Sequence, residues 1–364
     1  MSDEIPEPDR IEGAPHPRET STLHGQHAAE DAFLDVVRGG RLHHGWMLTG
    51  PRGVGKATLA WRIARWMIAG MPEGEAGLYI DADDSVFRRV ASLGEPRVLI
   101  CRRPWDDKTK KLRKQITVEE IRKLKSFFNM SAADGGWRVA IIDAMDDLNI
   151  QAQNALLKIL EEPPEKVLFL MVCHQPGRLL PTIRSRCREL RLTALDAASL
   201  GSAMMDAGFA PDADTEALAS LSGGSAGEAA RLIADEGLVI YANLVTILSG
   251  APRLDRALIA RMADGCAGRG AEDRYDLTVR LIALLLSRLA RTGAMGSPPP
   301  EAVEGEAKLL RKLSPTPFAA QDWATLAQTT SARIGHGRLV NLDPAQVILD
   351  TFLAIDTTAR RQIQ

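Results

Sequence analysis

Cysteine is scarce in this sequence. The 364 residues include four cysteines, and no two of them have the C-x-x-C spacing. They are Cys101, Cys173, Cys187 and Cys266. Scattered cysteines argue against a disulfide framework and against a zinc site. We therefore expect a reduced, cytoplasmic protein that holds no zinc, with Mg²⁺ as the one metal left to consider.

Long apolar runs and an excess of charge of one sign are also missing. No apolar stretch approaches the ~20 residues that span a bilayer, and the first residues lack the basic-then-apolar pattern of a signal peptide. We expect no membrane partner. The 45 Lys and Arg residues nearly balance the 47 Asp and Glu residues, for a net charge of −2. Any contact with nucleic acid would therefore have to come from a local basic patch.

The order of predicted elements divides the chain into four parts. Residues 1–20 are rich in Pro, Glu, Asp and Arg, and we predict a disordered tail there. Residues 21–193 alternate strand and helix patterns, which predicts an α/β domain with a parallel sheet and helices on both faces. Short helices predict a small helical lid over 194–237. The remainder, 238–364, is helical throughout, and such a domain without recognisable chemistry is usually scaffold or interface.

A phosphate-binding loop is the clearest chemical motif. Trp46 to Leu48 predict a short buried strand, and a helix is predicted from Leu59 onward. Between them lies a stretch that matches G-x-x-x-x-G-K-[ST] until its last position, which is Ala57 instead of a hydroxyl residue. Thr58 follows one residue later, about 100° around the helix. The expected nucleotide-binding residues are Gly50, Pro51, Arg52, Gly53, Val54, Gly55, Lys56, Ala57, Thr58 and Asp143. The alternative is a loop that the fold retains as architecture without catalysis.

Asp143 ends the strongest predicted strand, 137–143. In phosphate-loop proteins an aspartate at that point holds the Mg²⁺ shell. The next residue is Ala144, and the carboxylates of Asp146 and Asp147 come too late in the sequence to replace a water-polarising glutamate. The sequence therefore supports binding of ATP more than its hydrolysis. It supports Mg²⁺ only weakly.

The most basic segment is 102–114. It could contact a phosphate backbone, although a mobile solvated loop is the commoner explanation for such a run. Both readings stay open from the sequence.

Several motifs occur in one order along the chain: the phosphate loop, Asp143, the stretch 154–164 (NALLKILEEPP) and Ser185-Arg186-Cys187. Together they resemble the bacterial DNA polymerase III clamp-loader subunits of the AAA+ class. The last two motifs are much more specific than the loop. Ala57, Ala144, Gly227 and the missing cysteine cluster stand where a motor subunit would have catalytic or zinc-binding residues, so the resemblance is to the mostly non-hydrolysing delta-prime class.

This resemblance implies a stator in an ATP-driven ring that loads the sliding clamp onto primed DNA. It implies that Arg186 acts in trans on a neighbouring ATP site, the alternative being an arginine that supports a strand end through a salt bridge. Its implied partners are the motor gamma/tau subunits, the delta subunit, the clamp and primed DNA.

Asn154 and Lys158 lie four residues apart on one helix face, and they are candidates to contact DNA. They could instead orient the strand that ends at Asp143. Two other functions stay open for the whole chain: an active AAA+ ATPase in its own right, and a DNA-binding AAA+ adaptor that uses the basic segment.

Overall fold

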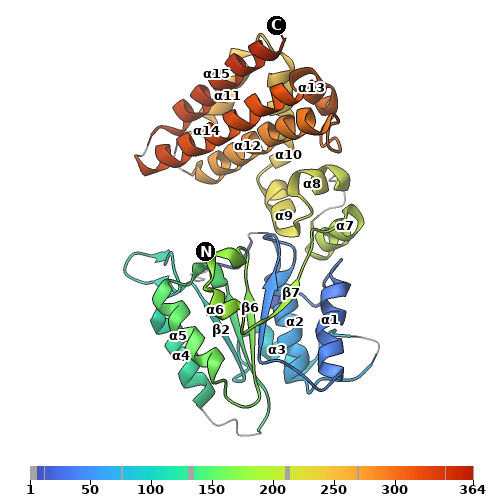
Figure 1. The fold of residues 1–364 in the computed structure, drawn as a ribbon, viewed down its shortest axis with the longest axis vertical. Helices are drawn as coiled ribbons and strands as arrows, with labels where there is room; N and C mark the ends of the chain where they lie inside the picture. The colour runs from blue at the N-terminus through green and yellow to red at the C-terminus, as the bar shows by residue number, and fades with distance from the viewer. Residues whose placement is uncertain are drawn as a thin grey trace. The chain divides into compact units, whose positions relative to one another are not determined.

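A computed structural model describes residues 6–11, 13–74, 77–129, 135–209, 214–268, 270–340 and 342–363. The chain divides into two compact units (Figure 1). The first comprises Met1–Ala210 with Ser225–Glu228, and the second comprises Pro211–Gly224 with Ala229–Gln364. These units do not coincide with the predicted boundaries at 193/194 and 237/238. A separate lid domain over 194–237 therefore stays a prediction.

The first unit is built on a five-stranded parallel sheet with the strand order β2-β5-β6-β1-β7. The strands are β1 (Gly45–Thr49), β2 (Val98–Arg102), β5 (Arg138–Asp143), β6 (Val167–Val172) and β7 (Arg188–Arg191). The central strands β1 and β6 are buried along their whole length, as strands covered on both faces are expected to be. This arrangement confirms the predicted α/β class.

Helices cover both faces of the sheet (Figure 1). On one face lie α1 (His27–Arg38), α2 (Lys56–Ile68) and α3 (Ser85–Ala91). On the other lie α4 (Val118–Asn129), α5 (Ile150–Glu161) and α6 (Pro181–Arg184). The first unit also contains α7 (Ala197–Asp206) and the short η1 (Pro17–Glu19), η2 (Met145–Asp147) and η3 (Pro176–Arg178).

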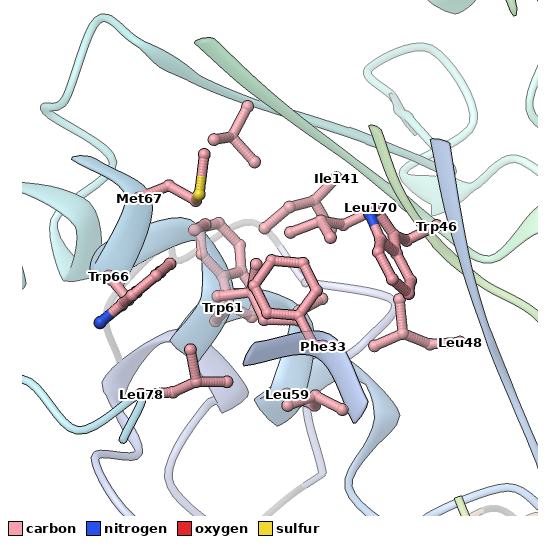
Figure 2. Close-up of a cluster of buried hydrophobic side chains, with 14 of the residues drawn as sticks. Phe33, Trp46, Leu48, Leu59, Trp61, Trp66, Met67, Leu78, Ile141 and Leu170 are labelled. Carbon is pink, nitrogen blue, oxygen red and sulfur yellow. The ribbon is translucent and has the colours of Figure 1, made fainter. Parts of the chain in front are cut away.

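The core between α1, α2 and the sheet is rich in aromatic side chains (Figure 2). The Phe33 ring meets the Trp46 ring edge-on, with 5.1 Å between centroids, and Trp66 at 6.3 Å. Trp61 is fully buried in the same cluster. Side chains buried nearly all round α2 hold this helix firmly against the sheet. Its first residue, Lys56, is thereby held directly after the loop that follows β1.

Residues 6–11 and 13–20 pack against the first unit, which differs from the predicted disordered tail. His16 is 0% exposed, and η1 carries a capping box between His16 and Glu19. Ion pairs with distant residues replace the apolar contacts that this segment lacks, and a sequence pattern does not reveal such pairs. Residues 1–5 and 12 of the predicted tail lie outside the described residues.

The second unit is helical, as predicted. Its helices are α8 (Thr215–Ser222), most of α9 (Ala226–Ala234), α10 (Gly237–Ser249), α11 (Arg256–Asp264), α12 (Glu272–Met295), α13 (Glu306–Leu313), α14 (Pro317–Leu339) and α15 (Pro344–Ile363). The long helices α12 and α14 lie side by side (Figure 1). Buried Trp323 of α14 donates its indole N–H to the Leu313 carbonyl at 2.8 Å. Among the described helices, no single one could span a membrane, and only the pair α9 and α10, bent by 78°, passes on length and composition together.

Candidate nucleotide site

The loop between β1 and α2 has the backbone that a phosphate-binding loop requires. Gly50, Gly53 and Gly55 have φ values of 133°, 72° and 101°, a region that side-chain-bearing residues rarely adopt. A Cβ on Gly53 would lie 2.3 Å from the Ser225 Oγ, so glycine is also required there for space. The buried Val54 turns its carbonyl to Gln26, whose amide donates to it at 3.1 Å. The loop is therefore shaped and held by the surrounding chain.

Lys56 is the first residue of α2 and is 3% exposed. Its Nζ donates to the Gly50 carbonyl at 2.8 Å and also to the Pro51 carbonyl. Burial lowers the pKa of Lys56 to about 8, and the nearby Asp143 opposes that fall. An ammonium group that is buried against neutral carbonyls lacks the full compensation that an anion would supply. The site is therefore suited to receive a phosphate oxygen.

Asp143 is the last residue of β5 and lies at the carboxyl end of the sheet, as the phosphate loop does. Burial raises the pKa of its carboxyl to about 7, the charge of Asp9 raises it further, and Lys56 opposes the rise. A carboxyl with that pKa is about half protonated at pH 7, and a positive charge that binds beside it would favour its ionised form. The ionisation state of Asp143 therefore depends on the charges that lie near it.

The pKa of Asp143 leads to a prediction about stability. The raised pKa means that the folded state keeps a proton that the unfolded state loses, so this stabilisation is complete below about pH 4 and is lost as pH rises through about 7. Asp143→Asn stays neutral, and we expect it to exceed the original chain in free energy of unfolding at pH 8 by about 1–2 kcal/mol, with no excess at pH 4. Urea titrations at both pH values measure the difference. The exposed Asp107→Asn is the control, and an excess that did not change with pH would contradict the assignment.

Asp146, and His174, which the sequence did not single out, complete this end of the sheet. Asp146 accepts hydrogen bonds from the backbone N–H groups of His174 and Gln175, both at 2.6 Å. His174 follows β6, and burial together with the charges of Lys56 and Arg52 lowers its pKa to about 4. Its Nδ1 is buried without a hydrogen-bond partner among the described residues. Only the pairing of β5 with β6 brings these residues together, so no local sequence signal could have identified them.

The groups that would hold Mg²⁺ and activate water are incomplete. Ala57 packs its methyl group against the core and offers no hydroxyl. Ala144 is 5% exposed and offers no carboxylate. The Asp146 carboxylate is already engaged by backbone N–H groups. No cluster of three His, Cys, Asp or Glu residues suited to a metal occurs within the described ranges. The loop and Lys56 fit a polyphosphate, whereas the usual magnesium and water positions lack their side chains.

Arg186 lies between α6 and β7, in a different part of the chain from the phosphate loop. Its guanidinium pairs with the Glu161 carboxylate at 3.0 Å and donates to the Thr182 carbonyl at 3.0 Å. The two paired side chains are 38% and 42% exposed. An ion pair that exposed contributes about 0–1 kcal/mol. The predicted salt-bridge alternative is thus present in the structure, but it would hold the arginine only weakly. The neighbouring Cys187 thiol has its pKa raised to about 12 by burial and is protonated at neutral pH.

Asn154 and Lys158 are exposed on α5. Their neighbour Gln153 is the buried residue of this turn, and its side chain bonds the Leu148 carbonyl and the Leu180 N–H. The internal bracing of this helix therefore comes from Gln153. Asn154 and Lys158 remain candidates for contact with another molecule.

The basic segment 102–114 is partly ordered by its own ion pairs. It contains a short antiparallel pair, β3 (Trp105–Asp106) and β4 (Lys111–Leu112). Arg102 is bound by Glu7 and Asp9, and Arg103 lies 3.2 Å from Asp147. Part of the predicted basic patch is thereby neutralised within the chain, which weakens its case as a DNA contact.

Comparisons with known proteins agree with this geometry. Residues 25–196 match the family model described as DNA polymerase III, delta subunit. The Pseudomonas aeruginosa DNA polymerase III subunit delta' is 33% identical over 200 residues, which cover 53% of this chain and 57% of the relative. The Yersinia pestis subunit delta' is 35% identical over 160 residues, covering 44% of each chain.

A tau subunit is also similar. That of Escherichia coli is 32% identical over 182 residues, covering 50% of this chain and 26% of its own. This chain thus spans about half the length of the two delta' relatives that it matches. A gamma subunit-related protein from Thermotoga maritima aligns with 91% of this chain at 17% identity and a TM-score of 0.39, which is too low to carry an argument.

The family match includes the phosphate loop, Asp143, α5 and Arg186. All four lie in the first unit, whose sheet and loop have been described above. Through residues 25–196 the chain is therefore similar to the family described as DNA polymerase III, delta subunit, and to the delta' subunits of two bacteria.

Proposed function

We propose that this chain is a stator subunit of the clamp loader that serves DNA polymerase III. In this role it joins motor gamma/tau subunits and the delta subunit in a ring that places the sliding clamp on primed DNA. The names of its relatives support the complex, since they include delta' and tau subunits. The soluble replication complex of the cytoplasm is the corresponding location.

The proposal rests on the exposure of Arg186 and on the partners of its guanidinium. The guanidinium lies at the surface, stays charged at any physiological pH, and is held by one exposed carboxylate and one backbone carbonyl. A neighbouring ATP could replace that carboxylate, because a planar guanidinium binds phosphate oxygens with two parallel hydrogen bonds. Glu161 belongs to the stretch 154–164 that carried the sequence resemblance, so the two specific motifs meet in one ion pair. We infer that Glu161 holds the arginine ready for the adjacent subunit.

The chain's own site supports binding more than hydrolysis. Lys56 and the glycine loop would hold the phosphates of ATP, whereas Ala57 and Ala144 remove a metal ligand and a base. ATP is therefore proposed as a bound group of this subunit, and Mg²⁺ only through Asp143. The rival, an active ATPase, would have to hydrolyse ATP without those two side chains.

The same proposal assigns roles to α5 and to the helices of the second unit. Exposed Asn154 and Lys158 would contact primed DNA, since an amide and an ammonium group both bind phosphate oxygens. The helices from α10 to α15 would form the collar that joins neighbouring subunits. Neither role requires a charge or cavity beyond those described.

Omission of this chain tests the proposal. The complete complex, with motor subunits, delta subunit, clamp and primed DNA, should hydrolyse ATP and load clamps, and loading should fall at least about tenfold without this chain. The chain alone should show no turnover above background. Full clamp loading without it would overturn the stator role. Steady turnover by the isolated chain would favour the rival ATPase, and Lys56→Ala would then identify the site responsible.

A further inference from the structure

We propose that residues 7–11 of this chain cover its own phosphate-loop site, and that a nucleoside triphosphate binds there only when this turn is displaced. We call residues 6–11 and 13–20 the N-terminal strap. The inference concerns the chain's own site and does not depend on Arg186 or on the assembled ring.

The strap binds the carboxyl end of the parallel sheet, where Asp143 lies. Arg102 ends β2 and is the direct register neighbour of Asp143 on β5. Its guanidinium binds the Asp9 carboxylate at 2.7 Å and the Glu7 carboxylate at 2.6 Å. Glu7 and Asp9 therefore neutralise Arg102, which lies one strand away from Asp143.

The same segment also approaches Gly227, a hydrogen-bond partner of the phosphate loop. The Arg10 N–H bonds the Glu7 carbonyl at 3.2 Å, which folds residues 7–10 into a compact turn. The Ile11 side chain that follows comes within 2.9 Å of where a Cβ on Gly227 would lie. Gly227 in turn donates its N–H to the Gly53 carbonyl of the loop at 3.0 Å. Residues 7–11 thus extend from Arg102 to Gly227, the partner of the glycine loop, and Asp143 on β5 lies between β2 and β1 in strand order.

The electrostatics make this turn a competitor of phosphate. Burial alone would raise the pKa of Glu7, but hydrogen bonds from Arg102 and Arg18 lower it below its usual range. Burial would likewise raise the pKa of Asp9, while His16 and Arg102 lower it. Both carboxylates are therefore anionic at neutral pH. Triphosphate oxygens would meet two like charges beside Asp143, and they would find Arg102 already neutralised.

The rest of the strap shows that this placement is built into the fold. His16 is fully buried, with its Nε2 3.1 Å from Asp9 and its ring edge-on to Trp61 at 6.4 Å. Arg18 binds Glu7 at 2.7 Å and the Ala91 carbonyl at 2.8 Å. The turn is held by ion pairs with charged partners, and such pairs can be exchanged for pairs with another anion.

The test measures affinity for an N-methylanthraniloyl-labelled ATP, with and without Mg²⁺, on the full-length chain. Glu7→Gln with Asp9→Asn keeps the shape of both side chains and removes their charge. We expect this double variant to bind the probe about tenfold more tightly or better. Asp31→Asn with Glu73→Gln is the matched control, because both side chains are exposed and the change in net charge is the same. The control should bind as the original chain does.

Hydrogen exchange gives a second readout that does not rely on a substitution. In the original chain, saturating ATP should speed amide exchange in residues 7–11 while slowing it in the loop 50–56. Equal affinities for the double variant and the original chain would overturn the proposal. Slower exchange in residues 7–11 with ATP would overturn it as well, since the turn would then be part of the bound site. Absence of binding in every variant at millimolar probe would also overturn it, whatever the fate of the stator role.

Discussion

Replacing Arg186 with alanine should lower ATP turnover by the assembled clamp loader by at least about tenfold, while this chain alone stays inactive. An arginine finger can contribute roughly 10³–10⁵ to the rate of phosphoryl transfer at the site it serves. The fall in the whole complex is expected to be smaller than that, because other subunits keep their own sites. Steady-state phosphate release with clamp and primed DNA measures the effect.

The design of the Arg186 experiment depends on its neighbours. Arg184 is an exposed arginine two residues away, and Arg184→Ala is the matched control with the same loss of charge and size. Arg186→Lys keeps the charge but loses the planar fork, so it should recover little of the lost rate. Folding should survive the change to alanine, because the pair with Glu161 is exposed and contributes about 0–1 kcal/mol. Unchanged turnover in a complex of normal composition would remove the trans role.

Glu306→Ala should destabilise the second unit by about 3–5 kcal/mol, which is the usual cost of breaking a buried ion pair from one side. Glu306 is 0% exposed, and its carboxylate pairs with the Arg288 guanidinium at 2.5 Å. It also accepts from the Tyr241 hydroxyl at 2.6 Å and from the Ala302 N–H at 2.7 Å. Removing the carboxylate leaves a buried guanidinium and a buried hydroxyl without their main acceptor.

This effect should appear as a fall of about 10 °C or more in the melting temperature of the second unit. Because the chain has two units, its unfolding need not be two-state, and amide exchange in α10 and α12 should be followed alongside the melting curve. Glu304→Ala is the control, since Glu304 is exposed two residues earlier. A melting temperature within about 2 °C of the original chain would show that the cluster tolerates the loss of its acid.

Much of the first unit could be predicted from residue patterns. The strand predicted at Trp46 to Leu48 is β1, and the strand predicted over 137–143 is β5, each to within one residue at each end. Continuous apolar runs identify buried parallel strands, and glycine spacing identifies a phosphate loop, because both signals are local. The helical character of residues 238–364 was also predicted, and α10 to α15 lie in that range apart from Gly237, the first residue of α10.

What escaped prediction depends on partners far apart in the sequence. Glu7 and Arg102 are separated by 95 residues, and no pattern in residues 1–20 indicates that this acidic stretch has a cation to bind. Asp146 was judged too late to serve as a catalytic base, and that judgement agrees with its role in holding the chain after β6. The roles of Arg186, Asn154 and Lys158 stay predictions, because each depends on another molecule.

Two buried arginines of α2 limit how the strap can move. Arg65 donates to the carbonyls of Arg18 and Thr20 at 2.7 and 2.6 Å, and Arg62 donates to that of Ser21. Releasing residues 18–21 would leave the buried Arg65 guanidinium without these two acceptors and Arg62 with Glu30 alone. Releasing residues 7–11 would instead break the ion pairs of Glu7 and Asp9 and one backbone hydrogen bond, from Ala14 to Ile11. Gly13, with φ of 77°, lies between these two stretches. We therefore infer a hinge at Gly13: residues 18–21 stay bound to α2, and residues 7–11 move.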